Sequence, residues 1–154
     1  MNYEESIEKY SDMMLRVAFQ IVKNQHDAQD VCQEVFVKLL KSKKEFETDE
    51  YEKAWLIRVT MNTAKDYVKS FWYRNRAELS EEIAVYDNEH LYVVEEIMRL
   101  PVKYRTPIYL YYYEGYSVRE IAKILQRSEN TVLTWLSRGR KKLQDGLMGG
   151  FADE

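Results

Sequence analysis

Polar and basic side chains near the C-terminus have the types and spacing needed to contact duplex DNA. They belong to two short amphipathic patterns, within residues 117–125 and from residue 130 onward, that are separated by a polar turn. Such a pair predicts a helix-turn-helix, whose second helix enters the major groove while neighbouring cations neutralise phosphates. The candidate DNA contacts are Asn130, Thr131, Thr134, Ser137, Arg138, Arg140 and Lys141. An ordinary helical hairpin with a solvated basic face is the alternative interpretation.

A second group of side chains combines cations with aromatic rings along a predicted helix within residues 51–73. Cations can follow the backbone of single-stranded DNA while rings stack on unpaired bases. Its candidate contacts are Arg58, Asn62, Lys65, Lys69 and Trp72. Trp72 fits either a DNA-stacking platform or packing at the end of the helix.

A third group lies on the predicted second helix, off its apolar face. Asp30, Gln33 and Glu34 occupy positions i, i+3 and i+4, which share one side of a helix. An acidic and amide-bearing surface suits a basic partner helix. A solvated helix surface with no partner is the alternative.

The elements that must position these groups are helices, because the chain has only 5 Gly and 2 Pro among 154 residues. Helical periodicity predicts a first helix over residues 3–22, a second that begins at an Asp27 N-cap and ends near Leu40, and a third from about Tyr51. In the C-terminal half, Pro107 is expected near the start of a helix that runs over residues 108–113. The third helix is expected to face the core with Trp55, Leu56, Val59, Ala64 and Val68.

The fold class that follows is all-α, with two small helical domains joined by an acidic linker. We expect a first domain over residues 1–73, a linker over 74–90, a second domain over 91–147 that contains the helix-turn-helix, and a flexible tail over 148–154.

The distribution of charge reconciles DNA binding with a formal net charge of −3. Residues 51–76 carry six Lys or Arg against two acids, and residues 117–147 carry seven against three. Residues 77–98 hold seven acids and neither Lys nor Arg. Two basic blocks are thus separated by an acidic one, and the field near DNA depends on this local pattern.

Catalysis, cofactors and membrane insertion find little support in the residues. His26 and His90 are far apart in the chain, Cys32 falls on an apolar face, and neither a phosphate-binding glycine loop nor a metal-ligand spacing is present. No segment is long and apolar enough to span a membrane, and the N-terminal residues lack a signal-peptide pattern. We expect no enzymatic activity, no cofactor or metal, and a cytoplasmic location.

Three segments in order resemble the small extracytoplasmic-function sigma factors of the bacterial sigma-70 family. The segment DAQDVCQEVFVKLLKS resembles their polymerase-binding helix, AWLIRVTMNTAKD their promoter-melting helix, and LPVKYRTPIYLYYYEGYSVREIAKIL the start of their C-terminal domain. The resemblance implies a factor that binds core RNA polymerase, recognises promoters and is held by an anti-sigma factor.

The same resemblance assigns the three groups of residues. Asp30, Gln33 and Glu34 would dock on the clamp helices of the largest polymerase subunit. The cations of the third helix would open the minus-ten element, with a flipped base held in a loop at about residues 44–53. The second helix of the helix-turn-helix would read the minus-thirty-five element, with Arg138 able to pair with guanine and Arg140 and Lys141 placed on phosphates.

Departures from the family pattern keep other readings open. Gln126 stands where the turn often has glycine, and Leu133 and Trp135 stand where polar or basic residues are common. Leu133 could pack on a thymine methyl group, but an apolar stripe that faces a partner protein is also possible. The rivals are a helix-turn-helix regulator that does not act through core polymerase, a protein-interaction module that has lost DNA recognition, and, more remotely, a nucleic-acid enzyme.

Overall fold

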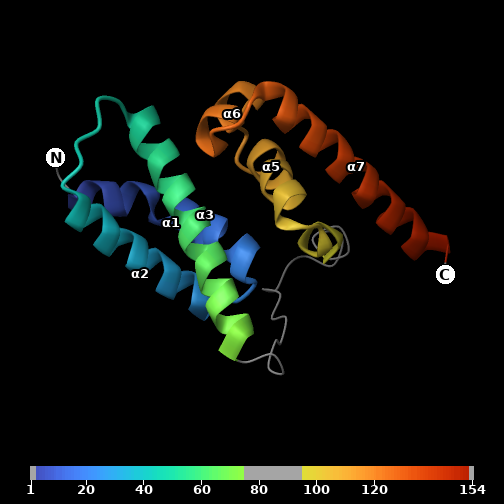
Figure 1. Ribbon diagram of the computed structural model, residues 1–154, viewed down its shortest axis with the longest axis horizontal. Helices are drawn as coiled ribbons and strands as arrows, with labels where there is room; N and C mark the ends of the chain where they lie inside the picture. Colours follow the sequence, from blue (N-terminus) through green and yellow to red (C-terminus); the bar gives the residue numbers. More distant parts are fainter. Residues whose placement is uncertain (1–2, 75–94, 153–154) are drawn as a thin grey trace. The chain divides into compact units, whose positions relative to one another are not determined.

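The computed structural model describes residues 3–74 and 95–152, with side chains over 3–70 and 95–147. Within these ranges all regular elements are helices and no strand occurs, so the all-α prediction is confirmed. The chain divides into two compact units, residues 1–84 and 85–154, each with its own helices (Figure 1). The acidic linker predicted from the sequence falls, after its first residue, outside the described residues.

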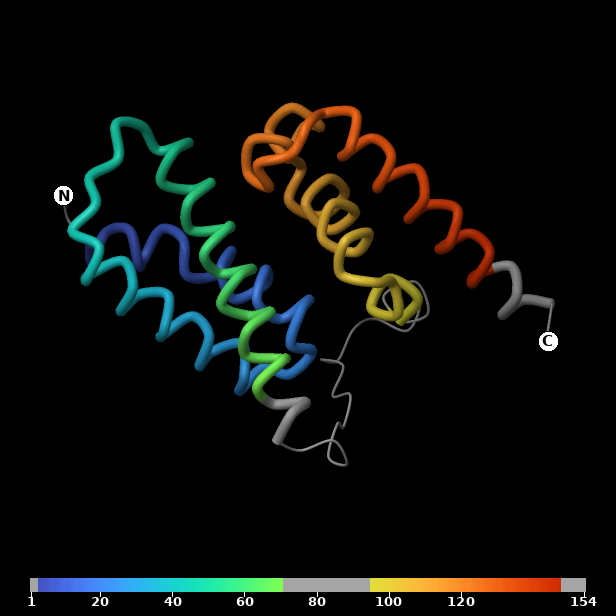
Figure 2. Tube along the Cα trace, in the orientation of Figure 1, coloured from blue at the N-terminus to red at the C-terminus, as the bar shows by residue number. Residues whose placement is uncertain are grey.

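Three helices form the N-terminal unit. They are α1 (Tyr3–Val22), α2 (Gln25–Ser42) and α3 (Asp49–Arg74), and each packs on the other two (Figure 2). Their apolar stripes meet in one core, which buries Tyr10, Met14, Val17, Ala18, Ile21, Ala28, Val31, Cys32, Val35, Leu39, Leu56, Ile57, Met61 and Ala64. This apolar burial stabilises the three helices, because most of the stability of helices in proteins comes from the packing of their apolar faces.

The start of α2 corrects the predicted Asp27 cap. Asn24 is the N-cap: its backbone is extended, with φ −147°, and its side-chain oxygen accepts a hydrogen bond from the Asp27 backbone N–H at 3.0 Å. Asp27 instead lies in the first turn of α2, where its carboxylate accepts a hydrogen bond from the Tyr67 hydroxyl at 2.9 Å. Burial, and then this bond, raise the pKa of Tyr67 to about 12. Asp27 therefore ties α2 to α3.

Helix α3 begins two residues earlier than the sequence pattern predicted. Thr48 accepts a hydrogen bond from the Tyr51 backbone N–H at 3.2 Å and so satisfies one of the free donors in the first turn. Of the predicted core residues, Leu56 and Ala64 are buried. The other three, Trp55, Val59 and Val68, are only half-buried. The sequence pattern missed Ile57 and Met61, which are buried because α3 packs on two helices and its apolar face is correspondingly wide.

Cys32 provides a test of the N-terminal core. Its side chain is buried between α2 and its neighbours, and burial raises the pKa of its thiol to about 11. Since the thiolate is the reactive form, only about one thiol in a thousand is ionised at pH 8. We expect native protein to react with iodoacetamide at least about a hundred times more slowly than urea-unfolded protein. Equal rates would show that this core is open in solution.

The C-terminal unit contains a helical turn at residues 95–99, then α5 (Val102–Tyr112), α6 (Val118–Leu125) and α7 (Glu129–Ala152). Helix α7 packs on both α5 and α6. The core buries Ile97, Met98, Leu100, Tyr104, Ile108, Leu110, Ile121, Ala122, Ile124, Val132 and Leu136. Because α7 runs to Ala152, it includes part of the segment that the sequence analysis assigned to a tail.

Pro107 does not open a helix, contrary to the prediction. Helix α5 begins at Val102 and contains Pro107 in its interior. The carbonyl of Pro101 accepts hydrogen bonds from the backbone N–H groups of Tyr104 and Arg105, both at 2.9 Å, and so fixes the helix start upstream. Pro107 removes one intrahelical hydrogen bond, which the buried packing of α5 offsets.

A buried cation joins α5 to the helical turn that precedes it. The Arg105 side chain is buried, and its guanidinium donates a hydrogen bond to the Met98 carbonyl at 2.6 Å. Burial lowers the pKa of Arg105 to about 10, although the bond is of the stronger, charge-assisted kind. Arg105 is therefore a structural residue that fixes the chain's entry into α5.

The turn of the helix-turn-helix is set by local capping. Ser117 and Glu120 form a reciprocal capping box at the start of α6. Gln126 then adopts a left-handed conformation with φ 55°, which glycine would adopt more readily. Ser128 caps α7, since its hydroxyl accepts a hydrogen bond from the Thr131 backbone N–H at 3.1 Å. These caps fix where the second helix begins and which of its faces is turned outward.

Candidate nucleic-acid interface

The outer face of α7 carries the predicted DNA contacts. Val132 and Leu136 are fully buried, so the side chains on the opposite side of the helix are available to a partner. The structure leaves Asn130, Thr134, Ser137, Arg138, Arg140 and Lys141 exposed and Thr131 half-buried. Lys142 is exposed beside them, and Leu133, between the polar positions, is 50% exposed.

The hydroxyl groups on this face are partly used within the helix. Thr134 donates its hydroxyl hydrogen to the Asn130 carbonyl at 2.9 Å. The hydroxyls of Thr131 and Ser128 lie 2.8 Å apart and share a hydrogen bond. Two of the candidate base contacts thus already have partners in the free protein.

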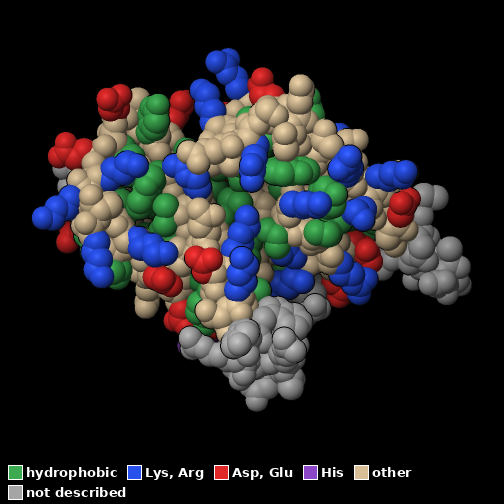
Figure 3. All heavy atoms as spheres, in the orientation of Figure 1, with side chains coloured by type: hydrophobic (Ala, Val, Ile, Leu, Met, Phe, Trp, Pro, Cys, Tyr) green, Lys and Arg blue, Asp and Glu red, His purple; other side chains and the backbone are tan. Residues whose placement is uncertain are grey.

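Two arginines of α7 interact with tyrosines of α5. The Arg140 guanidinium lies 5.9 Å from the ring centroid of Tyr111 and 5.8 Å from that of Tyr112, within the range of cation–π attraction. Burial raises the pKa of Tyr104, but hydrogen bonds to Lys103 and Arg138 outweigh it and lower this pKa below its usual value. Figure 3 shows Lys and Arg side chains lying among hydrophobic ones over this part of the molecule.

The outer face of α3 holds the second group in one line. Arg58, Asn62, Lys65 and Lys69 recur at intervals of three and four residues, which aligns them along the helix. Asn62 and Lys69 are exposed, and Arg58 and Lys65 are half-buried. The side chain of Trp72 lies outside the described residues.

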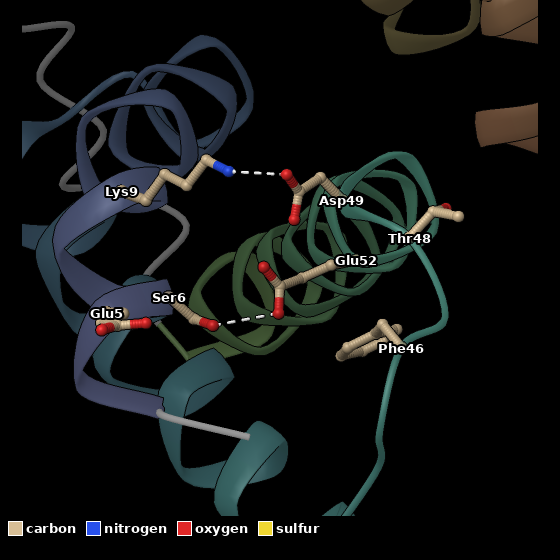
Figure 4. Close-up of a pocket in the computed structure, with 7 residues that line it drawn as sticks. All are labelled: Glu5, Ser6, Lys9, Phe46, Thr48, Asp49 and Glu52. Carbon is tan, nitrogen blue, oxygen red and sulfur yellow. Dashed lines mark hydrogen bonds and ion pairs between the residues drawn. The ribbon is translucent and has the colours of Figure 1, made fainter.

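The loop before α3 borders a polar cavity of about 230 Å³. Helix α1 contributes Ser6, whose hydroxyl donates a hydrogen bond to the Glu52 carboxylate at 2.9 Å, and Lys9, whose ammonium group pairs with Asp49 at 3.1 Å (Figure 4). The remaining lining side chains are Glu5, Phe46 and Thr48. Three carboxylates face one cation here, so the cavity disfavours a phosphate group.

An aromatic contact fixes this loop against α3. The rings of Phe46 and Trp55 lie 5.6 Å apart in a tilted arrangement, and the ammonium group of Lys44 lies within 6 Å of both rings, at 5.9 and 5.7 Å. Trp55 therefore supports the loop and does not belong to the central core.

The outer face of α2 contains more than the predicted acidic stripe. Asp30, Gln33 and Glu34 are exposed as the sequence analysis expected. Beside them, Val37 is 46% and Leu40 49% exposed, which is unusual for aliphatic side chains on a packed helix. The helical spacing from Gln33 to Val37 could have revealed this extension, but an aliphatic residue in a helix is first assigned to the core.

One group of potential metal ligands occurs in the described part of the chain. His26, Asp27 and Asp30 hold ligand atoms within 4.8 Å of one another. They lie in the first turns of α2, where the free N–H groups and the positive end of the helix dipole oppose a cation. The Nδ1 atom of His26 lies 3.5 Å from an Asp30 carboxylate oxygen, so the two side chains already satisfy each other in part.

Known proteins identify the chain through both of its units. The family model for Sigma-70 region 2 matches residues 6–73, and that for Sigma-70, region 4 matches residues 90–143. The RNA polymerase sigma factor SigV of Bacillus subtilis (strain 168) is 31% identical over 143 residues, which cover 84% of this chain and 81% of SigV. The ECF RNA polymerase sigma-E factor of Haemophilus influenzae is 30% identical over 142 residues, which cover 79% of this chain and 75% of that factor. The chain belongs to the extracytoplasmic-function sigma factors of the sigma-70 family.

Another curated relative and two solved structures are also similar to this chain. SigE of Mycolicibacterium smegmatis is 28% identical over 95% of this sigma factor, which spans 62% of the length of SigE. The solved structure of CnrH in complex with the cytosolic domain of CnrY superposes with a TM-score of 0.72 at 25% identity, covering 96% of this chain and 88% of that one. RpoE of Bartonella quintana, solved with the anti-sigma factor NepR, superposes with a TM-score of 0.78, and the match covers 95% of this chain and 96% of RpoE. At 19% identity, this superposition shows a shared fold and no more.

Family membership bears on the main alternative that the sequence left open. A sigma factor binds core RNA polymerase and directs the initiation of transcription, so a regulator that acts without polymerase is not favoured. Sigma factors are generally not enzymes. Among the described residues, none of the helices combines the length and apolar character needed to cross a membrane.

Proposed function

We propose that this sigma factor divides its work among three outer faces, on α2, α3 and α7. The observation that supports the division is that each face has its own chemistry although all three helices bury an ordinary apolar stripe. The face of α2 is acidic and aliphatic, that of α3 is cationic along one line, and that of α7 is polar and cationic within a capped helix-turn-helix.

Helix α2 is the proposed docking surface for core polymerase. Asp30 and Glu34 offer two carboxylates one turn apart, and Gln33 adds an amide between them. Val37 and Leu40 extend this surface with aliphatic area that would leave water on binding. Acids beside an aliphatic area suit a basic, amphipathic helix such as those of the polymerase clamp.

Helix α3 and the adjoining cavity are the proposed site for the minus-ten element. Arg58, Lys65 and Lys69 would follow the phosphates of the separated strand while Asn62 contacts a base edge, and Trp72 is our proposed stacking residue. The acid-lined cavity beside Phe46 has the room and polarity to receive an extruded base, with the phosphates kept outside.

Helix α7 is the proposed reader of the minus-thirty-five element. Arg138 is placed on a base edge, and Arg140 and Lys141 on the phosphates that flank it. The Tyr111 and Tyr112 rings would hold Arg140 in place, which lowers the side-chain entropy lost on binding. The remaining candidates, Asn130, Thr131, Thr134 and Ser137, line the same groove.

The rest of the proposal concerns partners and location. We expect the chain to have no catalytic activity of its own and to act in the cytoplasm, where polymerase and promoter DNA are found. Since solved relatives occur in complexes with an anti-sigma factor or a cytosolic domain, we also propose an anti-sigma partner that covers the polymerase and DNA surfaces.

Run-off transcription tests the proposed function. Bacterial core polymerase is incubated with fragments of the source genome, with and without the chain, and the transcript starts are sequenced. We expect new starts that depend on the chain and share two spaced upstream elements. Specific duplex binding by the pure chain, with no change in the starts, would contradict the proposal.

Two variants of α7 separate positioning from base reading. Lys141→Ala removes a phosphate contact, so it should weaken binding to all promoters alike and lower the slope of log affinity against log salt by about one. Arg138→Ala should cost about 1 to 3 kcal/mol on the cognate promoter and relax the preference at one base pair. Competition assays at several salt concentrations measure both effects. Arg99→Ala is the control, because it removes a positive charge from outside the helix-turn-helix and should leave both quantities unchanged.

A further inference from the structure

One edge of the outer face of α7 is apolar, where a DNA-reading helix usually offers hydrogen bonds. Leu133 is 50% exposed, whereas its neighbours Val132 and Leu136 are fully buried. The side chain therefore contributes little to the core of the C-terminal unit. Half of an aliphatic side chain is left to contact a partner.

Two hydroxyl groups near Leu133 in sequence are already engaged within the C-terminal unit. Thr134 has given its hydroxyl hydrogen to the Asn130 carbonyl, and the Thr131 hydroxyl is engaged with Ser128. A hydroxyl has one hydrogen to donate, so Thr134 cannot donate to a base acceptor without breaking a bond within its own helix. The part of the Thr134 side chain that remains without a polar contact within the helix is its methyl group.

The charge around Leu133 identifies the kind of partner. Exposed cations follow it along the same helix, at Arg138, Arg140, Lys141 and Lys142. Arg140 is in addition fixed over two tyrosine rings. A helix that carries both an exposed apolar side chain and several cations complements a duplex, in which base edges lie between two lines of phosphates. An apolar protein surface would leave these cations without counter-charges.

We propose that Leu133 reads the 5-methyl group of a thymine in the major groove. Thymine is the one base that presents an apolar group there, so an aliphatic side chain can distinguish it from the other three. The inference rests on the proposed function, in which α7 enters the groove at the minus-thirty-five element. It adds that this element contains a thymine opposite Leu133, recognised through its methyl group.

Replacing thymine by deoxyuridine tests the proposal, since this removes the methyl group and keeps the base pair. Promoters obtained by run-off transcription are synthesised with deoxyuridine at one upstream thymine at a time and bound to the complete holoenzyme. Burying one methyl group corresponds to about a fourfold change in affinity. We expect a loss of about that size at one or two positions with the unmodified sigma factor. Deoxyuridine outside both elements is the control for altered duplex stability.

Variants of Leu133 assign the effect to this side chain. Leu133→Ala should bind thymine and deoxyuridine promoters equally, and Leu133→Met, which keeps an apolar contact, should retain part of the difference. Both variants should fold, because residue 133 is exposed and Ala and Met favour helices.

Two results would overturn the inference. One is that no upstream thymine responds to loss of its methyl group. The other is that, at the responsive position, replacing thymine by deoxyuridine lowers the affinity of Leu133→Ala as much as that of the unmodified protein. In either case, a loss of promoter binding by Arg138→Ala would leave the proposed function standing. If Arg138→Ala and Lys141→Ala also had no effect, the proposed placement of α7 on DNA would itself fail.

Discussion

Replacing Gly139 with alanine is expected to destabilise the C-terminal unit by about 1 to 2 kcal/mol. Gly139 is buried in α7 where this helix crosses α5. A Cβ atom at this position would overlap Ile108 Cδ1 and lie 3.3 Å from both Ile108 Cγ1 and Tyr104 Cβ. Ile108 is only 1% exposed and cannot move aside. Overpacking costs about 1 to 3 kcal/mol, and the better helix propensity of alanine returns up to about 1 kcal/mol.

Gly146→Ala is the matched control, because it makes the same change farther along α7. Here the added Cβ meets Glu96 Oε2, the end of a flexible side chain that can turn away. The gain in helix propensity should dominate, with a change between zero and about 1 kcal/mol of added stability. Urea unfolding with amide exchange read separately in α5, α7 and the N-terminal unit measures both variants. Equal shifts of the same sign would show that the α5–α7 crossing is loose at Gly139.

Local capping explains why the helix-turn-helix could be predicted from sequence. The Ser117 and Glu120 side chains satisfy backbone groups within their own turn, so their spacing alone locates the start of α6. Pro107 shows the opposite case. The start of α5 is set by hydrogen bonds to the Pro101 carbonyl and by burial of the whole helix, which the local preference of Pro107 does not encode.

Burial on two sides explains the errors on α3. A helix that packs on a single neighbour shows one narrow apolar stripe, and the sequence analysis assumed such a stripe. Helix α3 contacts both α1 and α2, so Ile57 and Met61 are buried as well, while Val59 lies at the border. The width of a buried face depends on the partners of a helix, which become known only from the tertiary structure.

Helical spacing predicted which candidate residues share an exposed helix face, but it did not predict the details of those faces. Helical spacing placed Asp30, Gln33 and Glu34 on one face, and it placed the cations of α7 in the same way. The half-exposed state of Val37 and Leu40 could not be predicted from the sequence, because exposure of an aliphatic residue depends on how far the neighbouring helices extend. The internal hydrogen bonds of Thr131 and Thr134 depend on rotamers, which no sequence pattern reports.

Reversing the charges of Asp30 and Glu34 is expected to weaken binding to core polymerase by on the order of a hundredfold or more, because like charges across an interface cost several kcal/mol. The variant is Asp30→Lys with Glu34→Lys. Both side chains are exposed, and their ion pairs in the free protein, with His26 at 3.5 Å and Lys38 at 3.7 Å, are surface pairs. Such pairs contribute at most about 1 kcal/mol each, so the fold should survive.

Glu8→Lys with Asp12→Lys is the control for this experiment. These acids are also exposed, and they also lie one helical turn apart, on α1. The two double variants therefore change the net charge equally and place the new lysines at the same spacing. Competition with the unmodified sigma factor for core polymerase, at low and moderate salt, measures the affinities. We expect the α2 variant to lose binding and its salt dependence, and the α1 variant to retain both. Similar losses in the two variants would mean that net charge, and not the face of α2, governs docking, and the proposed polymerase surface would then have to be abandoned.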